Sequence, residues 1–290
     1  MTSSRDEHLL RFRRVLEYID AHLEEDLNVE RLSSVAAYSK FHFHRQFSAL
    51  FGASVSEYVQ LLRLKRGSYE LAFREDRKVI EIALTSGYER PEAFARAFKK
   101  ALGQSPSDFR KQPEWIAWHE TYRPLQRVRQ EHMKPEDQSK RVKVIEFEET
   151  KVALLEHRGD PRRIGDTIRA FIEWRRANHL SPKVSATFNL LYNDPDTTPP
   201  EEFRLDLCAA TDAPVAGNTA GVVARTIPKG RCAVLRHVGS DDGFREIFRR
   251  LYSEWLPSSG EEPRDFPLFV ERVRFFPDVP EHEAITDVFL

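Results

Sequence analysis

Hydrophobic residues recur at helical spacing through the N-terminal part of the chain. Within residues 6–23 they fall every three or four positions, which is the spacing of one buried helix face. The same pattern returns over 28–37, and Ser39 then precedes a third predicted helix with Phe43 and Phe47 on one side. We therefore expect an all-helical N-terminal part whose core is built from these apolar faces.

This helical part repeats itself at an offset of 51 residues. The segment from Arg45 to Tyr58, Arg-x-Phe-x-x-x-Phe-Gly-x-Ser-x-Ser-Glu-Tyr, returns from Arg96 to Phe109 as Arg-x-Phe-x-x-x-Leu-Gly-x-Ser-x-Ser-Asp-Phe. A repeat of that length with helical periodicity indicates a duplicated supersecondary unit. Because each copy contains two short helices joined by a turn, the sequence predicts two helix-turn-helix units, whose second helices enter the major groove of DNA.

The outward face of each second helix carries the candidate DNA contacts. Arginine occupies the same register in both copies, at Arg45 and Arg96, and arginine is the commonest reader of guanine. A basic face on one helix is usually only solvated, but solvation gives no reason for the arginine to repeat. We expect base contacts from Phe41, His44, Arg45, Gln46, Glu92, Ala95 and Arg96. We expect phosphate contacts from Lys40, Lys65, Arg66, Arg90, Lys99 and Lys100.

From residue 141 the pattern changes to short alternating strands and longer helical segments. The segment Val-Ala-Leu-Leu-x-His-x-Gly from Val152 to Gly159 recurs 80 residues later as Cys-Ala-Val-Leu-x-His-x-Gly, and similar helices and strands follow each copy. We therefore expect a multidomain fold. The all-α bipartite helix-turn-helix domain would be followed by an α+β domain of two pseudo-symmetric strand-helix-strand-strand modules, with a ligand cleft at their junction.

One carboxylate and several aromatic side chains are the candidate ligand contacts of this second half. Strand alternation points Glu271 the same way as Phe269 and Val273, and a carboxylate on an apolar face is costly unless a cation compensates it. That cation is either a neighbouring arginine, Arg272 or Arg274, or a ligand. Most aromatic residues belong to a core. The residues expected to bind an effector are Glu271, Trp174, Phe188, Tyr192, Trp255 and Phe269.

The stretch between the two halves reads as a connector. Residues 113–140 turn polar and lose apolar periodicity after Leu125. Trp115 and Trp118 are unusual for a bare linker, so this stretch is expected to pack on one of the domains. The predicted division is therefore 1–112 for DNA binding, 113–140 as linker, and 141–290 for binding a small molecule.

Charge and cysteine usage agree with this division. The net charge of -1 conceals 22 Lys and Arg against 18 Asp and Glu in residues 1–130, and 23 against 28 in residues 131–290. A basic front half is compatible with nucleic acid. Cys208 and Cys232 have apolar neighbours, which favours buried thiols in a reducing compartment. Without an apolar run of about 18 residues or a signal peptide, we expect a cytoplasmic protein with no membrane partner.

Residues 6–111 resemble the DNA-binding domain of AraC/XylS-type bacterial transcription regulators. The motifs that carry the resemblance are Gly87-Tyr88, Phe94-x-Arg96-x-Phe98-Lys99, Gly103, Ser105-Pro106 and Phe109-Arg110. The resemblance implies that Phe41, His44 and Arg45 face bases in the first reading helix. It implies the same for Glu92, Ala95 and Arg96 in the second. Phe41 departs from the tryptophan common among the small stress and drug-resistance activators of that family.

Residues 141–290 resemble the GyrI-like effector-binding domain. Its marks here are His157-x-Gly159, Tyr192-Asn193-Asp194-Pro195, Phe203-Arg204-x-Asp206 and Glu271. In drug-responsive relatives, the glutamate equivalent to Glu271 meets cationic apolar compounds at the base of an aromatic cleft. The combined resemblance implies a regulator whose partners are double-stranded DNA and a small hydrophobic or cationic effector, with RNA polymerase as a candidate third.

Two other functions stay open, a GyrI-like hydrolase and a protein-binding domain, each fused to a DNA-binding module. The sequence offers little for catalysis, because Ser54 and Ser105 lack the closing glycine of a nucleophile elbow and are explained as helix caps. His42 and His44 stand two residues apart and cannot share a helix face, so they are poor metal ligands. We expect no catalytic residue, metal or cofactor.

Overall fold

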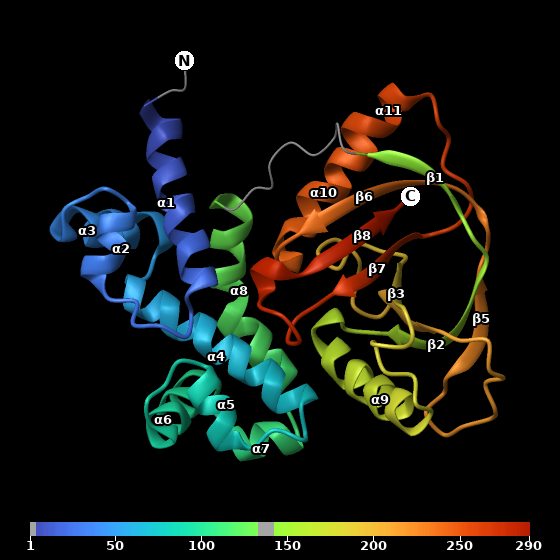
Figure 1. Ribbon diagram of the computed structural model, residues 1–290, viewed down its shortest axis with the longest axis horizontal. Coiled ribbons are helices and arrows are strands. Elements are labelled where there is room, and N and C mark those ends of the chain that lie inside the picture. Colours follow the sequence, from blue (N-terminus) through green and yellow to red (C-terminus); the bar gives the residue numbers. More distant parts are fainter. Residues whose placement is uncertain (1–3, 133–141) are drawn as a thin grey trace. The chain divides into compact units, whose positions relative to one another are not determined.

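The computed structural model describes residues 4–132 and 142–290 (Figure 1). The chain divides into two compact units. The first comprises Met1–Lys134 with Pro280–His282, and the second comprises Pro135–Val279 with Glu283–Leu290.

The described part of the first unit is helical and contains both predicted helix-turn-helix units (Figure 1). Gly52 and Gly103 end the two reading helices in the left-handed conformation, with φ of 67° and 75°. Ser54 and Ser105 then cap the helices that follow, as the repeat predicts. The helices are α1 (Ser4–Ala21), α2 (Val29–Val35), α3 (Lys40–Phe51), α4 (Val55–Phe73), α5 (Val79–Thr85), α6 (Pro91–Leu102), α7 (Pro106–Lys111) and α8 (Trp115–His132).

Phenylalanine side chains fix each reading helix to its unit. In the first copy the ring of Phe12 in α1 stacks on Phe43 of α3 with centroids 5.9 Å apart, and both rings are fully buried. In the second copy Phe94 and Phe98 of α6 are fully buried. Because the same side of each reading helix is anchored in this way, the opposite side is left to solvent.

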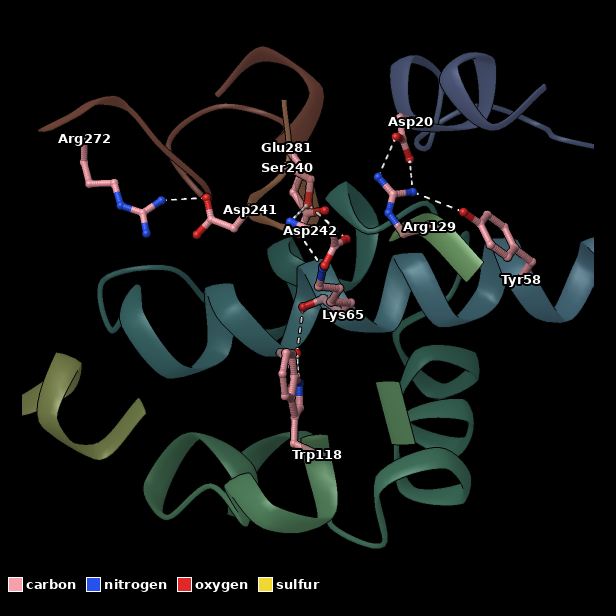
Figure 2. A network of polar contacts seen from close by, with 11 residues as sticks. Asp20, Tyr58, Lys65, Trp118, Arg129, Ser240, Asp241, Asp242, Arg272 and Glu281 are labelled. Atoms are coloured by element: carbon pink, nitrogen blue, oxygen red, sulfur yellow. Dashed lines mark hydrogen bonds and ion pairs between the residues drawn. The ribbon is translucent and has the colours of Figure 1, made fainter. Parts of the chain in front are cut away.

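Residues 115–132 form helix α8 where the sequence led us to expect a polar connector. Trp118 donates a hydrogen bond from Nε1 to Oγ of Ser68 in α4 at 2.6 Å. The guanidinium of Arg129 donates to both carboxylate oxygens of Asp20 at 2.9 and 2.8 Å, and to the hydroxyl of Tyr58 at 3.1 Å (Figure 2). The buried residue Arg129 occupies a position of α8 where helix periodicity calls for an apolar side chain. The apolar pattern therefore did not predict this helix. Residues 133–140 of the predicted connector lie outside the described residues.

The second unit is built on an eight-stranded antiparallel sheet of order β1-β6-β8-β7-β3-β4-β2-β5 (Figure 1). Its strands are β1 (Lys143–Phe147), β2 (Thr150–Arg158), β3 (Thr187–Leu191), β4 (Arg204–Ala210), β5 (Val223–Ile227), β6 (Gly230–Val238), β7 (Leu268–Arg274) and β8 (Ile285–Phe289). Its main helical segments are α9 (Ile164–Ala177), α10 (Phe244–Arg250), the π-helical η4 (Leu251–Trp255) and α11 (Leu256–Ser259). The elements β2-α9-β3-β4 and β6-α10-β7-β8 are the two predicted modules, and they meet where β3 pairs with β7.

The two faces of the curled sheet have different roles. One face packs against the helices, with Leu207 under α9, and Val270 packed with Ile247 of α10. The other face carries what we call the phenylalanine cluster, which is Phe147, Phe188, Phe266, Phe269 and Phe289. The free thiols of Cys208 and Cys232 are buried beside this cluster, as predicted. Burial raises the pKa of both thiols.

Candidate DNA-reading helices and effector site

The outer side of α3 presents the side chains predicted to read bases. Phe43, Phe47 and Phe51 are buried on the inner side, which leaves His44 and Arg45 exposed. Phe41 is 73% exposed at the start of the helix.

The outer side of α6 has the same arrangement. Glu92, Arg96 and Lys99 are exposed and Ala95 is half-buried, while Phe94, Phe98 and Leu102 are buried on the other side. Among the residues that the structure describes, neither Arg45 nor Arg96 has a hydrogen-bond or ion-pair partner. Within residues 4–132 and 142–290, the repeated arginine is therefore a guanidinium without a partner in both copies.

Gln46 does not belong to the exposed face, which corrects the prediction. It is half-buried, and its Oε1 atom is buried without a hydrogen-bond partner among the described residues. One position past Arg45 is a rotation of about 100° around a helix. That rotation turns Gln46 from the outer side toward the packed side.

The predicted phosphate contacts also separate into two groups. Arg90, Lys99 and Lys100 are exposed at the two ends of α6. Lys40 is exposed as well, 3.6 Å from Glu30.

Two of the predicted phosphate contacts are corrected by the structure. Arg66 donates from Nη2 to Glu24 at 2.7 Å and from Nε to the buried Glu70 at 3.3 Å. Lys65 lies beside it in α4 and is only partly exposed. Both positions belong to the packing of α4 rather than to a free basic surface.

The two turns differ by one residue, which sequence reasoning missed. The amide of Tyr38 donates to the carbonyl of Ser33, and Tyr88 donates equivalently to Ala83. These pairs are 50 residues apart, whereas the helices α3 and α6 that follow begin 51 residues apart. Gly87 takes the left-handed position in the second turn, with φ of 80°. The extra residue thus follows Tyr88 and delays the start of α6.

On the face of the sheet that carries the phenylalanine cluster, Glu271 is the candidate effector contact. It pairs in the sheet with Phe188 of β3 and with Asp287 of β8. Among the described residues its carboxylate has no hydrogen-bond or ion-pair partner. Burial, and next the negative charge of Asp287, raise the pKa of Glu271, while the positive charge of Arg236 acts in the opposite sense.

Neither neighbouring arginine compensates this carboxylate. Arg272 donates from Nη1 to Asp241 at 2.6 Å and from Nε to Asn189 at 3.0 Å, on the helix-covered face (Figure 2). Arg274 follows a bulge in β7 and donates to Glu283 at 2.9 Å. The ion pair with Arg272 or Arg274, one of the two alternatives that the sequence left open, is therefore not formed.

A row of charged and polar residues lies along the same face, and we call it the polar belt. Asp206 is fully buried and accepts from Nε and Nη2 of Arg204 at 3.1 and 2.8 Å and from the Tyr192 hydroxyl at 2.9 Å. Burial, with the Asp206 hydrogen bond next, raises the pKa of Tyr192 to about 12. The members of the polar belt are Glu156, Tyr192, Arg204, Asp206, Arg236, Glu271 and Asp287.

The second module contains an equivalent pair within the belt. Arg236 donates to Asp287 through two bonds of 2.7 Å. Asp287 faces Glu271 across the strands, while its counterpart Asp206 faces Leu190. Glu271 is therefore a carboxylate where the other module has a leucine. The sequence signal for the belt is an aspartate in the last strand of each module, Asp206 in β4 and Asp287 in β8.

The structure separates the predicted aromatic contacts. Phe188 and Phe269 lie on the face of Glu271, within the phenylalanine cluster, and Tyr192 lies in the polar belt. Trp174 instead belongs to α9 and stacks on Phe171 of the same helix, with centroids 6.1 Å apart, so it lies on the opposite face. Trp255 lies in η4, and within the described residues no ring contact joins it to the cluster. Trp174 therefore does not lie on the face of Glu271, because its ring serves the packing of helix on sheet.

Comparisons with known proteins identify both units. The family model of the GyrI-like small molecule binding domain matches residues 140–290, and a helix-turn-helix domain model matches residues 32–112. The chain belongs to the GyrI-like family and is an AraC-type transcription regulator with a helix-turn-helix DNA-binding domain and a small-molecule-binding domain.

Relatives in Escherichia coli K12 match different shares of the chain. The probable transcriptional regulator YgiV is 37% identical over 150 residues, covering 51% of this chain and 94% of YgiV. The right origin-binding protein is 32% identical over 106 residues, covering 37% of this chain and 36% of that protein. A cryo-EM structure of an EcmrR–DNA complex is 13% identical with a TM-score of 0.43, covering 87% of this chain and 84% of the other.

The described residues contain neither a membrane-spanning helix nor a metal-binding cluster. No helix in residues 4–132 or 142–290 is long and apolar enough to span a bilayer. No group of three or more His, Cys, Asp or Glu side chains among the same residues could hold a metal ion.

Proposed function

We propose that this regulator reads a two-part operator with α3 and α6 and responds to a hydrophobic cation bound at Glu271. The observation that carries the DNA-reading part is the pair of free guanidinium groups, Arg45 and Arg96, in the same register on two exposed helix faces. A bidentate arginine contact to guanine is worth about 1–3 kcal/mol of discrimination.

The two copies address different sequences. Phe41 and His44 occupy the outer face of α3 where α6 has Glu92 and Ala95. An apolar ring favours thymine methyl groups, whereas a carboxylate accepts from cytosine. We therefore infer two unlike half-sites, in major grooves that are about 34 Å apart on one side of the duplex.

The free carboxylate of Glu271 supports the effector part of the proposal. It lies next to the phenylalanine cluster, and each belt aspartate already has its own arginine. An organic cation with apolar groups would neutralise Glu271 and bury its surface against the aromatic residues around it.

Regulation rather than catalysis is the activity we propose for this protein. Ser54 and Ser105 accept hydrogen bonds from the backbone amides of Glu57 and Asp108, so they act as helix caps. His157 bonds Thr167 and the carbonyl of Asp160 beside a structural turn. We also propose RNA polymerase as the partner through which bound operator changes transcription.

The DNA-reading proposal can be tested with duplexes selected from a random pool by the wild-type protein. Arg45→Ala and Arg96→Ala should each lose about tenfold or more in affinity and relax base preference in one half-site only. Arg14→Ala is the matched control, since Arg14 is an exposed α1 residue without a partner among the described residues. If all three variants bind alike, the proposed reading helices are wrong.

Calorimetry with tetraphenylphosphonium as the probe tests the effector proposal. Glu271→Gln should weaken binding by about tenfold or more, because it removes the uncompensated charge. Glu149→Gln, which changes an exposed glutamate of the same unit, should bind like the wild type. Equal binding by both variants would remove Glu271 from the site.

A further inference from the structure

The offset of 51 residues also relates helix α1 to helix α4, and four equivalent positions differ in character between the two helices. In α1 they are apolar and fully buried, and they hold the first helix-turn-helix to its supporting helix. A unit of this fold therefore needs only apolar side chains there. In α4, 51 residues later, the same positions are mostly polar. The pairs are Phe12 and Arg63, Val15 and Arg66, Leu16 and Gly67, and Ile19 and Glu70.

The guanidinium of Arg63 donates hydrogen bonds to the first half of the DNA-binding unit. Its Nε atom donates to the carbonyl of Leu23 at 3.0 Å, and Nη2 donates to the carbonyl of Glu25 at 2.6 Å. Both carbonyls belong to the short segment between α1 and α2. Arg66 adds an ion pair to Glu24 in that segment at 2.7 Å. The chain leading into the first helix-turn-helix is thus held by α4.

The same guanidinium also contacts the second half. A methyl group on Gly87 would lie 2.6 Å from Nε of Arg63 and 2.9 Å from the carbonyl oxygen of Leu23. Such distances are closer than real contacts, so the turn between α5 and α6 packs directly on Arg63. Gly67 is packed just as closely, since a methyl group there would lie 3.0 Å from Oγ of Ser86 in the turn and 2.9 Å from the ring of Phe94 in α6.

Arg63 thus joins the segment before the first helix-turn-helix to the turn of the second. We infer that Arg63 is a positioning residue that sets the spacing and rotation between α3 and α6, and hence the separation of half-sites that the protein accepts. This inference rests on the proposed reading of DNA by both helices. The planar guanidinium of Arg63 suits this role because it donates to two carbonyls in fixed directions while the backbone at Gly87 packs closely against it.

The test measures spacing selectivity rather than affinity alone. The parent duplex is selected by the wild-type protein, and two further duplexes have one base pair inserted or deleted between the half-sites, which changes separation by about 3.4 Å with a rotation of about 35°. The affinity of the wild-type protein should be about tenfold or more lower for either altered duplex than for the parent duplex. Arg63→Met keeps much of the side-chain volume but cannot donate hydrogen bonds. Its affinity for the altered duplexes should therefore be lower than for the parent duplex by only about threefold or less.

Controls separate positioning from stability and from the proposed function. Arg14→Met should keep the wild-type ratio, and Arg63→Lys, which can still donate, should fall between wild type and Arg63→Met. If Arg63→Met does not fold, as judged by its thermal melt, the ratio for Arg63→Lys decides. An unchanged ratio in the deciding variant would overturn the inference while leaving DNA reading intact. A wild type that selects no duplex would overturn the proposed function itself.

Discussion

Glu271 destabilises the fold that contains it, because burial and the charge of Asp287 both disfavour its ionised form. A carboxyl whose pKa is raised in the folded state favours folding less when it is ionised than when it is protonated. The penalty is fully present above the folded-state pKa and is lost as pH falls through that value toward the unfolded-state pKa. A cost of this kind is typical of residues retained for function.

Glu271→Gln should therefore raise the unfolding temperature at pH 8. The difference from wild type should shrink as pH is lowered, because protonation of Glu271 then removes the charge that distinguishes it from glutamine. Calorimetric scans of the full chain at several pH values measure this effect. Glu149→Gln, at an exposed position, should show no such pH-dependent gain. A destabilised Glu271→Gln at pH 8 would mean that the carboxylate has a stabilising partner.

The opposite case is Arg129, whose charge is buried but fully partnered. Arg129→Met should lower the free energy of unfolding by about 3 kcal/mol, because it leaves the carboxylate of Asp20 buried without its cation. Urea unfolding followed by circular dichroism gives the difference. Arg127→Met, at an exposed residue of the same helix, should change stability by less than about 0.5 kcal/mol. Similar losses in both variants would indicate that α8 is sensitive to any change of charge.

At the scale of elements, Gly67 lets α4 approach α6 closely. Alanine improves helix propensity by about 1 kcal/mol, but its methyl group would meet the buried ring of Phe94 at 2.9 Å, and overpacking costs about 1–3 kcal/mol. We expect Gly67→Ala to lose about 1 kcal/mol in urea unfolding and to weaken DNA binding, since Phe94 belongs to the reading helix. Ser56→Ala, on the exposed side of α4, should lose neither. A more stable Gly67→Ala would show that the ring moves aside freely.

Patterns of period 3.6 and 2 predicted the helices and strands well where one face is apolar. The glycine stops and serine caps were predicted for a local reason, since each depends on a few adjacent residues. Helix α8 was missed because Arg129 is buried through contacts with α1 and α4, which are distant in the sequence. The place of Trp174 was missed for a similar reason, since the repeat located its helix but not the face of the sheet that the helix covers.

The candidate sites divide along the same line. The exposed arginines of α3 and α6 follow directly from helix periodicity, as does the side of β7 that carries Glu271. Helix periodicity does not predict which cations lack an ion-pair partner, because partners such as Glu24 for Arg66 come from other elements. The absence of a contact from Arg272 to Glu271 also depends on the partner strand and on Asp241.

At the scale of the whole molecule, net charge says little about DNA binding because many charges of the described residues are paired internally. The first 130 residues exceed neutrality by only four positive charges, yet exposed cations gather on the two reading helices and their ends. Four of them, Lys40, Arg90, Lys99 and Lys100, are the remaining phosphate candidates. Neutralising about four phosphates predicts that log K falls with log salt concentration with a slope of about −4.

The slope distinguishes free cations from paired ones. Replacing Lys99 and Lys100 with alanine together should make the slope shallower by about 2 and leave base preference unchanged, because phosphate contacts carry no sequence information. Arg66→Gln should leave the slope at its wild-type value, since the charge of Arg66 is already matched by Glu24 and Glu70. Titrations at several salt concentrations against the selected duplex measure all three proteins. A slope that falls equally in both variants would show that Arg66 leaves its partners to bind phosphate.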